Sequence, residues 1–184
     1  TLPAAGDGTG TFSTDDVGVM EVSGATVTVE GLTITGGNRA EGGGIRVFPT
    51  MGGSTGLTLT DTVVTGNQGE FGGGIYTEGL LKLNGSTVSN NEASRNDTTW
   101  ENYGGGIYNT AGRVELRDSD VLGNEAMSEG GGIYNVDGTV ISADSSRINN
   151  NDADLEGGGI YNEDGNLNLR DSEIDGNSSG LAAG

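Results

Sequence analysis

Hydrophobic residues alternate with polar ones in short segments along most of the chain. In the segment VELRDSDVLGN, Val114 and Leu116 are separated by one polar residue, and Val121 follows after a polar break. Alternation with a period of two is the pattern of a half-buried β-strand. The pairs DS, GN and GG that interrupt such segments favour turns, and no amphipathic segment of helical length lies between them. The pattern predicts an all-β protein with strands of about three residues.

Two motifs recur along the chain at intervals of roughly 30 residues. The triplet GGG begins at positions 42, 72, 104, 130 and 157. Between the triplets lie LTLTDTVVTGN (57–67), LKLNGSTVSNN (81–91), VELRDSDVLGN (114–124), ISADSSRINNN (141–151) and LNLRDSEIDGN (167–177), with a longer first copy at 27–38. Such a period predicts a solenoid, here a single-stranded parallel β-helix of about six turns with three short strands per turn. A rise of about 4.8 Å per turn gives a rod of roughly 29 Å.

The repeats predict columns of equivalent residues along the axis. The glycine triplets mark tight corners, because glycine accepts a positive φ and lets backbones approach closely. The isoleucine after each triplet is expected to point inward, and the residue after it outward. Small polar residues and asparagines form further columns, which we expect to hydrogen-bond along the axis. The columns contain Ile45, Ile75, Ile107, Ile133 and Ile160; Thr62, Ser86, Ser119, Ser146 and Ser172; and Asn67, Asn91, Asn124, Asn151 and Asn177.

The pattern GGGIYN…L.L.DS.V.GN resembles the right-handed parallel β-helix repeats of bacterial and archaeal surface proteins. It is similar in style to the repeats of chlamydial polymorphic outer-membrane proteins, which carry a GGAI-like motif and a motif that ends in asparagine. The resemblance covers about residues 17–177 and implies a right-handed solenoid. It implies no single function, since such repeats occur in adhesins, cell-surface stalks and other secreted proteins.

The chain is strongly acidic, with 27 acidic and 8 basic side chains and a formal net charge of -19. This charge disfavours nucleic acid and anionic membrane surfaces as partners. A solvated acidic surface, cation binding and a high-salt habitat remain open as explanations. The chain contains no cysteine and no apolar run near the length that spans a bilayer. The start, TLPAAGDGTGTF, is typical of a mature secreted chain, so we expect a secreted or cell-surface protein.

Acidic residues occupy equivalent positions in the last two full repeats. The expected pairs are Asp137 with Asp164 and Glu129 with Glu156, and Glu125 with Asp152 forms a third. Residues on adjacent turns stack about 5 Å apart, where carboxylates repel each other. Calcium, which prefers oxygen ligands, would reverse the repulsion. Calcium bridging, best at Asp137 and Asp164, and carboxylates that simply splay into solvent are the two interpretations.

Aromatic residues supply the candidate binding face. Tyr76, Tyr108, Tyr134 and Tyr161 are expected to form an outward stripe that stacks on sugar rings, docks a second subunit or only stabilises the sheet. The insertion at 92–103 contains Trp100 beside Tyr103. Trp100 is either an exposed contact residue or a side chain that covers the flank of the solenoid. Within the insertion, Asn96 begins an Asn-Asp-Thr glycosylation sequon.

Catalytic chemistry has little support in the sequence. The chain has no histidine, so no serine–histidine pair is possible, and Lys82 is its single lysine. Pectate lyases and polygalacturonases share the predicted fold more distantly, but the chain lacks a matching cluster of acidic and basic residues. We therefore expect no enzyme, and a polysaccharide-active enzyme is the least favoured alternative.

The expected function depends on whether the two ends of the predicted solenoid are covered. We expect one domain over 1–184, with an N-terminal partial turn at 1–26, repeats at 27–177 and a tail at 178–184. Neither end has an amphipathic helix to cover the open strands, which are templates for further pairing. Head-to-tail stacking of copies would form a filament or a stalk. The sequence thus predicts an extracellular structural protein, with an adhesin or carbohydrate-binding module as the alternative.

Overall fold

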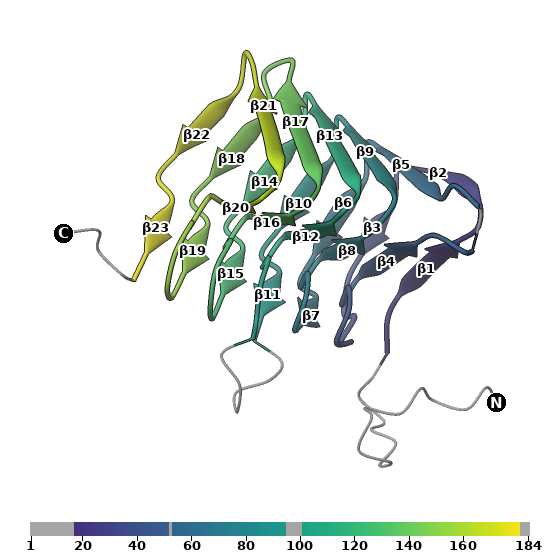
Figure 1. Cartoon of the computed structure of the whole chain (residues 1–184), viewed down its shortest axis with the longest axis horizontal. Helices are drawn as coiled ribbons and strands as arrows, with labels where there is room; N and C mark the ends of the chain where they lie inside the picture. The colour runs from purple at the N-terminus through teal and green to yellow at the C-terminus, as the bar shows by residue number, and fades with distance from the viewer. Residues whose placement is uncertain (1–16, 52, 95–100, 181–184) are drawn as a thin grey trace, which may run out of the picture.

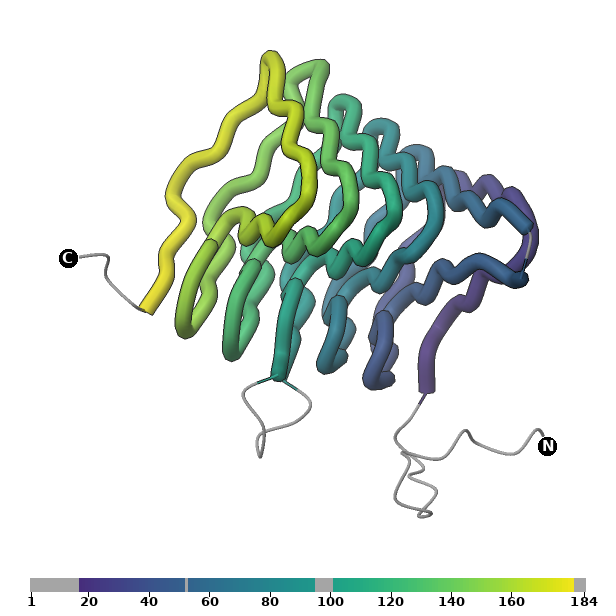
Figure 2. Tube along the Cα trace, viewed as in Figure 1, coloured from purple at the N-terminus to yellow at the C-terminus, as the bar shows by residue number. Residues whose placement is uncertain are grey.

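A computed structural model describes residues 17–51, 53–94 and 101–180 of the chain (Figure 1). All regular elements in these ranges are β-strands, and no helix occurs there. The chain winds around one axis in six successive turns (Figure 2). The first strand, β1 (Met20–Ser23), and the last, β23 (Ser178–Ser179), lie at opposite ends of the stack (Figure 1). The predicted all-β parallel solenoid of about six turns is confirmed.

Four parallel sheets run along the axis, and each full turn adds one strand to each sheet. The first sheet contains β1, β4 (Ile45–Phe48), β8 (Ile75–Thr77), β12 (Ile107–Thr110), β16 (Ile133–Val136) and β20 (Ile160–Glu163). The second sheet contains β2 (Thr26–Glu30), β5 (Gly56–Thr60), β9 (Leu80–Asn84), β13 (Arg113–Arg117), β17 (Thr139–Ala143) and β21 (Asn166–Leu169).

The third and fourth sheets consist of shorter strands. The third sheet contains β3 (Thr33–Ile34), β6 (Val63–Thr65), β10 (Thr87–Ser89), β14 (Asp120–Leu122), β18 (Arg147–Asn149) and β22 (Glu173–Asp175). The fourth contains β7 (Gln68–Gly69), β11 (Glu92–Ala93), β15 (Glu125–Ala126), β19 (Asp152–Ala153) and β23. The prediction of three strands per turn is wrong, because the two-residue strands of the fourth sheet are too short to show alternation in the sequence.

Each glycine of a triplet is required for a different reason, as Gly130, Gly131 and Gly132 illustrate. Gly130 has a φ of 70°, in the left-handed region that glycine adopts without strain. A Cβ on Gly131 would overlap the carbonyl oxygen of Asp152 on the next turn and lie 2.6 Å from that of Gly158. A Cβ on Gly132 would lie 2.5 Å from the carbonyl oxygen of Gly159. The triplet is therefore a corner at which adjacent turns pack backbone against backbone.

The interior is filled by columns of aliphatic side chains. The isoleucines after the triplets pair in register through the first sheet, from Ile45 to Ile160. Ile45, Ile75, Ile107 and Ile133 are fully buried, as predicted. The second sheet adds two columns and the third adds one, and together they form one continuous core. Burial of these columns is the main stabilising contribution to the fold.

A corner asparagine ladder runs along the solenoid between the third and fourth sheets. Asn124 shows the pattern: its Nδ2 donates to the carbonyl oxygen of Val88 at 3.0 Å and to Oδ1 of Asn151 at 2.9 Å. Its Oδ1 accepts from the backbone N–H and from Nδ2 of Asn91, both at 3.0 Å. The predicted asparagine column is confirmed, and it comprises Asn67, Asn91, Asn124, Asn151 and Asn177.

The predicted hydroxyl column forms over four turns. The backbone N–H of Thr62, Ser86 and Ser119 each donates to the side-chain oxygen of the next turn, at 3.1 to 3.2 Å. At the last turn the arrangement changes, and the Ser172 hydroxyl instead lies 2.9 Å from that of Ser142. The corner of the fifth turn has one residue more than that of the fourth, because Ala143 pairs with Arg117 and Arg147 pairs with Asp120. The backbone N–H of Ser146 there donates to the carbonyl oxygen of Ala143 instead of to the next turn.

Candidate functional site

The predicted tyrosine stripe forms a stack of four rings along the first sheet. Tyr76, Tyr108, Tyr134 and Tyr161 are neighbours in register on β8, β12, β16 and β20. Successive ring centroids lie 5.4, 5.1 and 5.1 Å apart, with interplanar angles of 5°, 3° and 18°. The rings therefore turn their faces to one another along the stack, in the stacked geometry that stabilises aromatic pairs.

A second row of side chains covers the tyrosine stack. It consists of the residues that immediately precede the glycine triplets, and Glu41, Phe71 and Tyr103 pair in register within it. Phe71 meets Tyr108 edge to face at 5.4 Å, and Tyr103 lies 4.9 Å from Tyr134. Because of this cover, the outward-facing Tyr134 is only 7% exposed. The row joins the stack in one surface, which we call the aromatic face.

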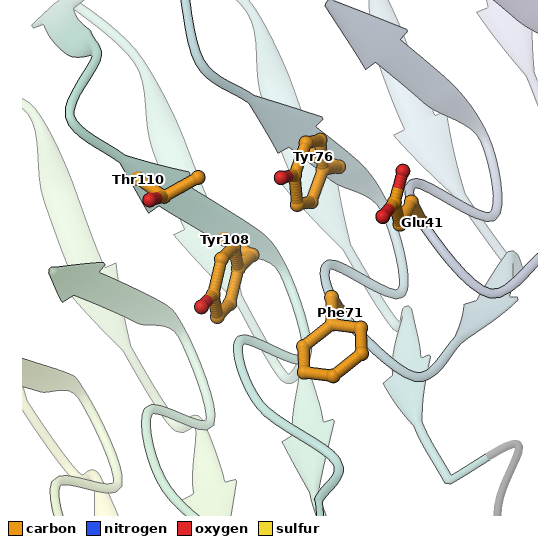
Figure 3. A pocket seen from close by; sticks show the side chains of 5 residues that line it. All are labelled: Glu41, Phe71, Tyr76, Tyr108 and Thr110. Carbon is orange, nitrogen blue, oxygen red and sulfur yellow. The ribbon is translucent and has the colours of Figure 1, made fainter.

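A shallow pocket of about 180 Å³ opens in the aromatic face (Figure 3). Phe71, Tyr76 and Tyr108 supply aromatic walls, while Glu41 and Thr110 supply a carboxylate and a hydroxyl. Apolar ring edges beside a few polar groups are the composition of small-molecule sites. The pocket has the groups to contact a sugar ring or an organic cation.

Carboxylates surround the tyrosine hydroxyls. The Tyr76 hydroxyl donates to Glu78 at 2.8 Å, and the Tyr134 hydroxyl donates to Glu163 at 2.6 Å. Burial and then these hydrogen bonds raise the pKa of both tyrosines well above the usual range. Burial also raises the pKa of Tyr108. The rings are therefore neutral hydrogen-bond donors at physiological pH.

Arginine ends the tyrosine stack toward the N-terminus. Arg46 occupies the tyrosine position on β4, next to Tyr76. Its guanidinium forms an ion pair with Glu41 at 2.7 Å and lies 4.2 Å from the centre of the Phe48 ring. This cation–π contact and ion pair place the positive charge of Arg46 at the edge of the pocket that Glu41 lines.

The four predicted calcium ligands fall into two separate pairs. Asp137 and Asp164 follow β16 and β20, at corners where both residues have a positive φ, 55° and 53°. Glu129 and Glu156 precede the glycine triplets at the other end of these strands. In residues 17–51, 53–94 and 101–180, no cluster of three or more acidic, histidine or cysteine side chains is grouped to hold a metal ion. Calcium binding by either pair stays a prediction.

Glu129 and Glu156 instead border the aromatic face. Burial, followed by repulsion from Glu156 and Glu163, raises the pKa of Glu129. Burial, and then the nearby Glu156 and Glu129, raise the pKa of Tyr161. In the third acidic pair, burial and then the neighbouring Glu92 and Asp152 raise the pKa of Glu125. The structure therefore places Glu129 and Glu156 beside the predicted tyrosines. Asp137 and Asp164 lie away from the tyrosines, at the other end of β16 and β20.

Two predicted positions, Trp100 and the sequon residue Asn96, lie outside the described residues. Tyr103, expected beside Trp100, packs against Phe71 and Tyr134 in the aromatic face. Sequence reasoning did not assign Glu41 and Phe71 to this face. Their position before GGG is the signal that could have found them, since it holds Glu, Phe, Tyr, Glu and Glu in successive turns.

A second asparagine ladder was not predicted from the sequence. Asn109, Asn135 and Asn162 are equivalent on β12, β16 and β20, where they close the motif GGGIYN. Nδ2 of Asn109 donates to Oδ1 of Asn135, and Nδ2 of Asn135 donates to Oδ1 of Asn162, both at 2.6 Å. The recurrence of IYN was the available signal. Asn109 and Asn135 are buried, whereas Asn162 on the last turn is exposed, so the ladder is an interior feature that ends at the open last turn.

Comparison with known proteins establishes the family. The model of the right-handed β-helix region matches residues 17–184, so the chain belongs to this family. No curated protein and no solved structure matches the chain. The described residues include no helix with the length and apolar character needed to cross a membrane.

Proposed function

We propose that the chain is an extracellular structural protein whose solenoid associates end to end, as a filament subunit or as part of a cell-surface stalk. The observation that carries the proposal is the exposure of core columns at the ends. Leu167, Leu169 and Ile174 on the last turn are 40%, 41% and 46% exposed. Val140 and Ile148, which precede Leu167 and Ile174 in the same columns, are fully buried.

The first turn is open in the same way. Val17, Val19 and Leu32 are 58%, 47% and 55% exposed, and Met20, Val27 and Val29 are only partly buried. Val22 and Ile34 of the same turn are buried, so the first turn is open over part of its end. Exposed apolar surface next to unpaired strand edges favours association. The family resemblance to surface proteins supports an extracellular location.

The test is sedimentation of the full chain over a wide concentration range, with electron microscopy of the same samples. We expect the average mass to rise with concentration, together with rods of increasing length and constant width. A single monomeric species at every concentration and salt level would rule out the proposal. Samples with and without calcium also test bridging at Asp137 and Asp164. Calcium should raise the unfolding temperature of the chain and should not raise that of the Asp137→Asn variant.

Carbohydrate binding is a second candidate, favoured by the pocket in the aromatic face. Its aromatic edges, Glu41 carboxylate and Thr110 hydroxyl match the apolar and polar faces of a sugar. The test is a glycan array probed with the native chain, Tyr108→Ala and Trp100→Ala. Binding that both variants lose would support the candidate, whereas equal signals from all three chains would exclude it.

A further inference from the structure

We propose that the partner at each open end is a second copy of this chain, stacked head to tail with its first turn in register on the last turn. The inference rests on the proposed end-to-end function and adds the register and the residues that select it. Three sheets define the register, because their columns of strand residues run from the first turn to the last. The fourth sheet begins at β7, and Asn38 of the first turn already pairs there with Val17, so the junction joins the other three sheets.

The aliphatic columns continue across such a junction without a break. Four inward aliphatic positions on the last turn would each meet an aliphatic residue on the first turn of the next copy, and the inward Asn162 would meet Val22. In the first sheet, Ile160 would meet Met20, the residue that begins its own column. The other inward pairs are Leu167 with Val27, Leu169 with Val29, and Ile174 with Ile34.

The charged positions are also compatible in this register. Arg170 directly follows Leu169, so it continues the column that begins with Glu30. The junction would therefore place Arg170 beside Glu30 of the next copy. Glu163 and Glu173, the acidic residues of the last turn on β20 and at the start of β22, would face the uncharged Ser23 and Thr33. In this register no strand position sets two like charges against each other.

Opposite charges that are neighbours in one column already form ion pairs inside the solenoid. Arg147 is in register with Asp120 and forms a two-bond contact with its carboxylate, at 2.8 and 2.6 Å. Lys82 and Glu115 also pair in register, at 3.7 Å. The same geometry at the junction would pair Arg170 with Glu30. Stacking two C-terminal ends would instead bring the acidic residues of both last turns together, which disfavours that arrangement.

The polar ladders stop at the junction. Within the chain, each corner asparagine donates its backbone N–H to Oδ1 of the asparagine on the next turn. The equivalent residue of the first turn is Gly37, which donates to Asn67 in the same way but has no side-chain oxygen to offer. An in-register junction would thus lack an acceptor that every internal contact has. We therefore expect it to be weaker than an internal contact and to dissociate reversibly on dilution.

Charge reversal on both sides of the junction tests the register. We would measure the dissociation constant of full-chain self-association by sedimentation for the native chain, Arg170→Glu, Glu30→Arg and the double variant. Each single variant should weaken association about threefold to tenfold, and the double variant should restore it. The double variant has the net charge of the native chain, which makes it a matched control.

A second control distinguishes the effect of the Arg170–Glu30 ion pair from that of the general repulsion between two acidic copies. Glu30→Arg and Asp175→Arg lower the negative charge equally, but Asp175 has no charged partner in the proposed register. Asp175→Arg should leave association unchanged or strengthen it, whereas Glu30→Arg should weaken it. Association that persists but ignores the single variants, or a double variant that is not restored, overturns the register and leaves the proposed function standing. Absence of any association in the native chain overturns both.

Discussion

Replacing Asn124 with alanine removes one amide from the middle of the corner asparagine ladder. The native side chain takes part in four hydrogen bonds, two as donor and two as acceptor, at 2.9 to 3.0 Å. A net contribution of about 1 kcal/mol for each bond gives a loss of about 4 kcal/mol. The alanine also leaves two donors of Asn91 and the carbonyl of Val88 without this partner in the interior. The expected decrease in the free energy of unfolding is about 3–5 kcal/mol.

The assay is urea-induced unfolding at 25 °C, followed by circular dichroism. Asn177→Ala is the matched control, because Asn177 ends the same ladder and is only partly buried. Its side chain takes part in three of these bonds, and water can replace them there. We expect a loss of about 1–2 kcal/mol from the control. Equal losses from the two variants, or a loss below about 1 kcal/mol at Asn124, would refute the role given to the ladder.

Three further predictions test the corner, the aromatic face and its charge. Gly131→Ala should cost at least about 3 kcal/mol of unfolding free energy because its Cβ would overlap the next turn, whereas Gly56→Ala, with 3.7 Å of clearance, should stay within about 1 kcal/mol of the native chain. Tyr134→Phe should cost about 1 kcal/mol through its lost hydrogen bond and Tyr134→Ala about 3–5 kcal/mol, and equal losses in urea unfolding would contradict the stacking argument. The raised pKa of Glu129 means that the folded chain binds this proton more tightly, a stabilisation that is present at low pH and lost as pH rises through the folded pKa. Glu129→Gln should therefore be more stable than the native chain at pH 7 and equal to it below about pH 4, which thermal unfolding across this range would check.

The repeat pattern in the sequence was sufficient to predict the solenoid and its main columns. The isoleucine column and the corner asparagines recur once per turn, so each copy supports the same assignment. The glycine triplets predicted a tight corner, but the distinct role of each glycine depends on the neighbouring turn. Gly131 and Gly132 face carbonyl oxygens roughly 27 residues away, and local sequence does not reveal such contacts.

The candidate site was only partly predictable, for a similar reason. The tyrosines could be found because they recur after isoleucine. Phe71 and Glu41 occupy one column, but that column mixes acidic and aromatic residues, so its chemistry does not indicate a shared face. The predicted acidic pairs Asp137–Asp164 and Glu129–Glu156 were assigned correctly to adjacent turns. The two pairs lie at opposite ends of β16 and β20, and Glu129 lies beside the tyrosines. Only the arrangement of the sheets shows both facts.

The axial repeat of the assembled protein tests the central claim most directly. Six turns with a rise of about 4.8 Å predict a subunit repeat of about 29 Å along the fibre if copies stack in register. Cryo-electron microscopy of the assemblies measures this repeat and the rise between turns together. A continuous solenoid with both spacings is the result that the account predicts. Side-by-side association of the rods, with the core columns of the end turns still open to solvent, would contradict it.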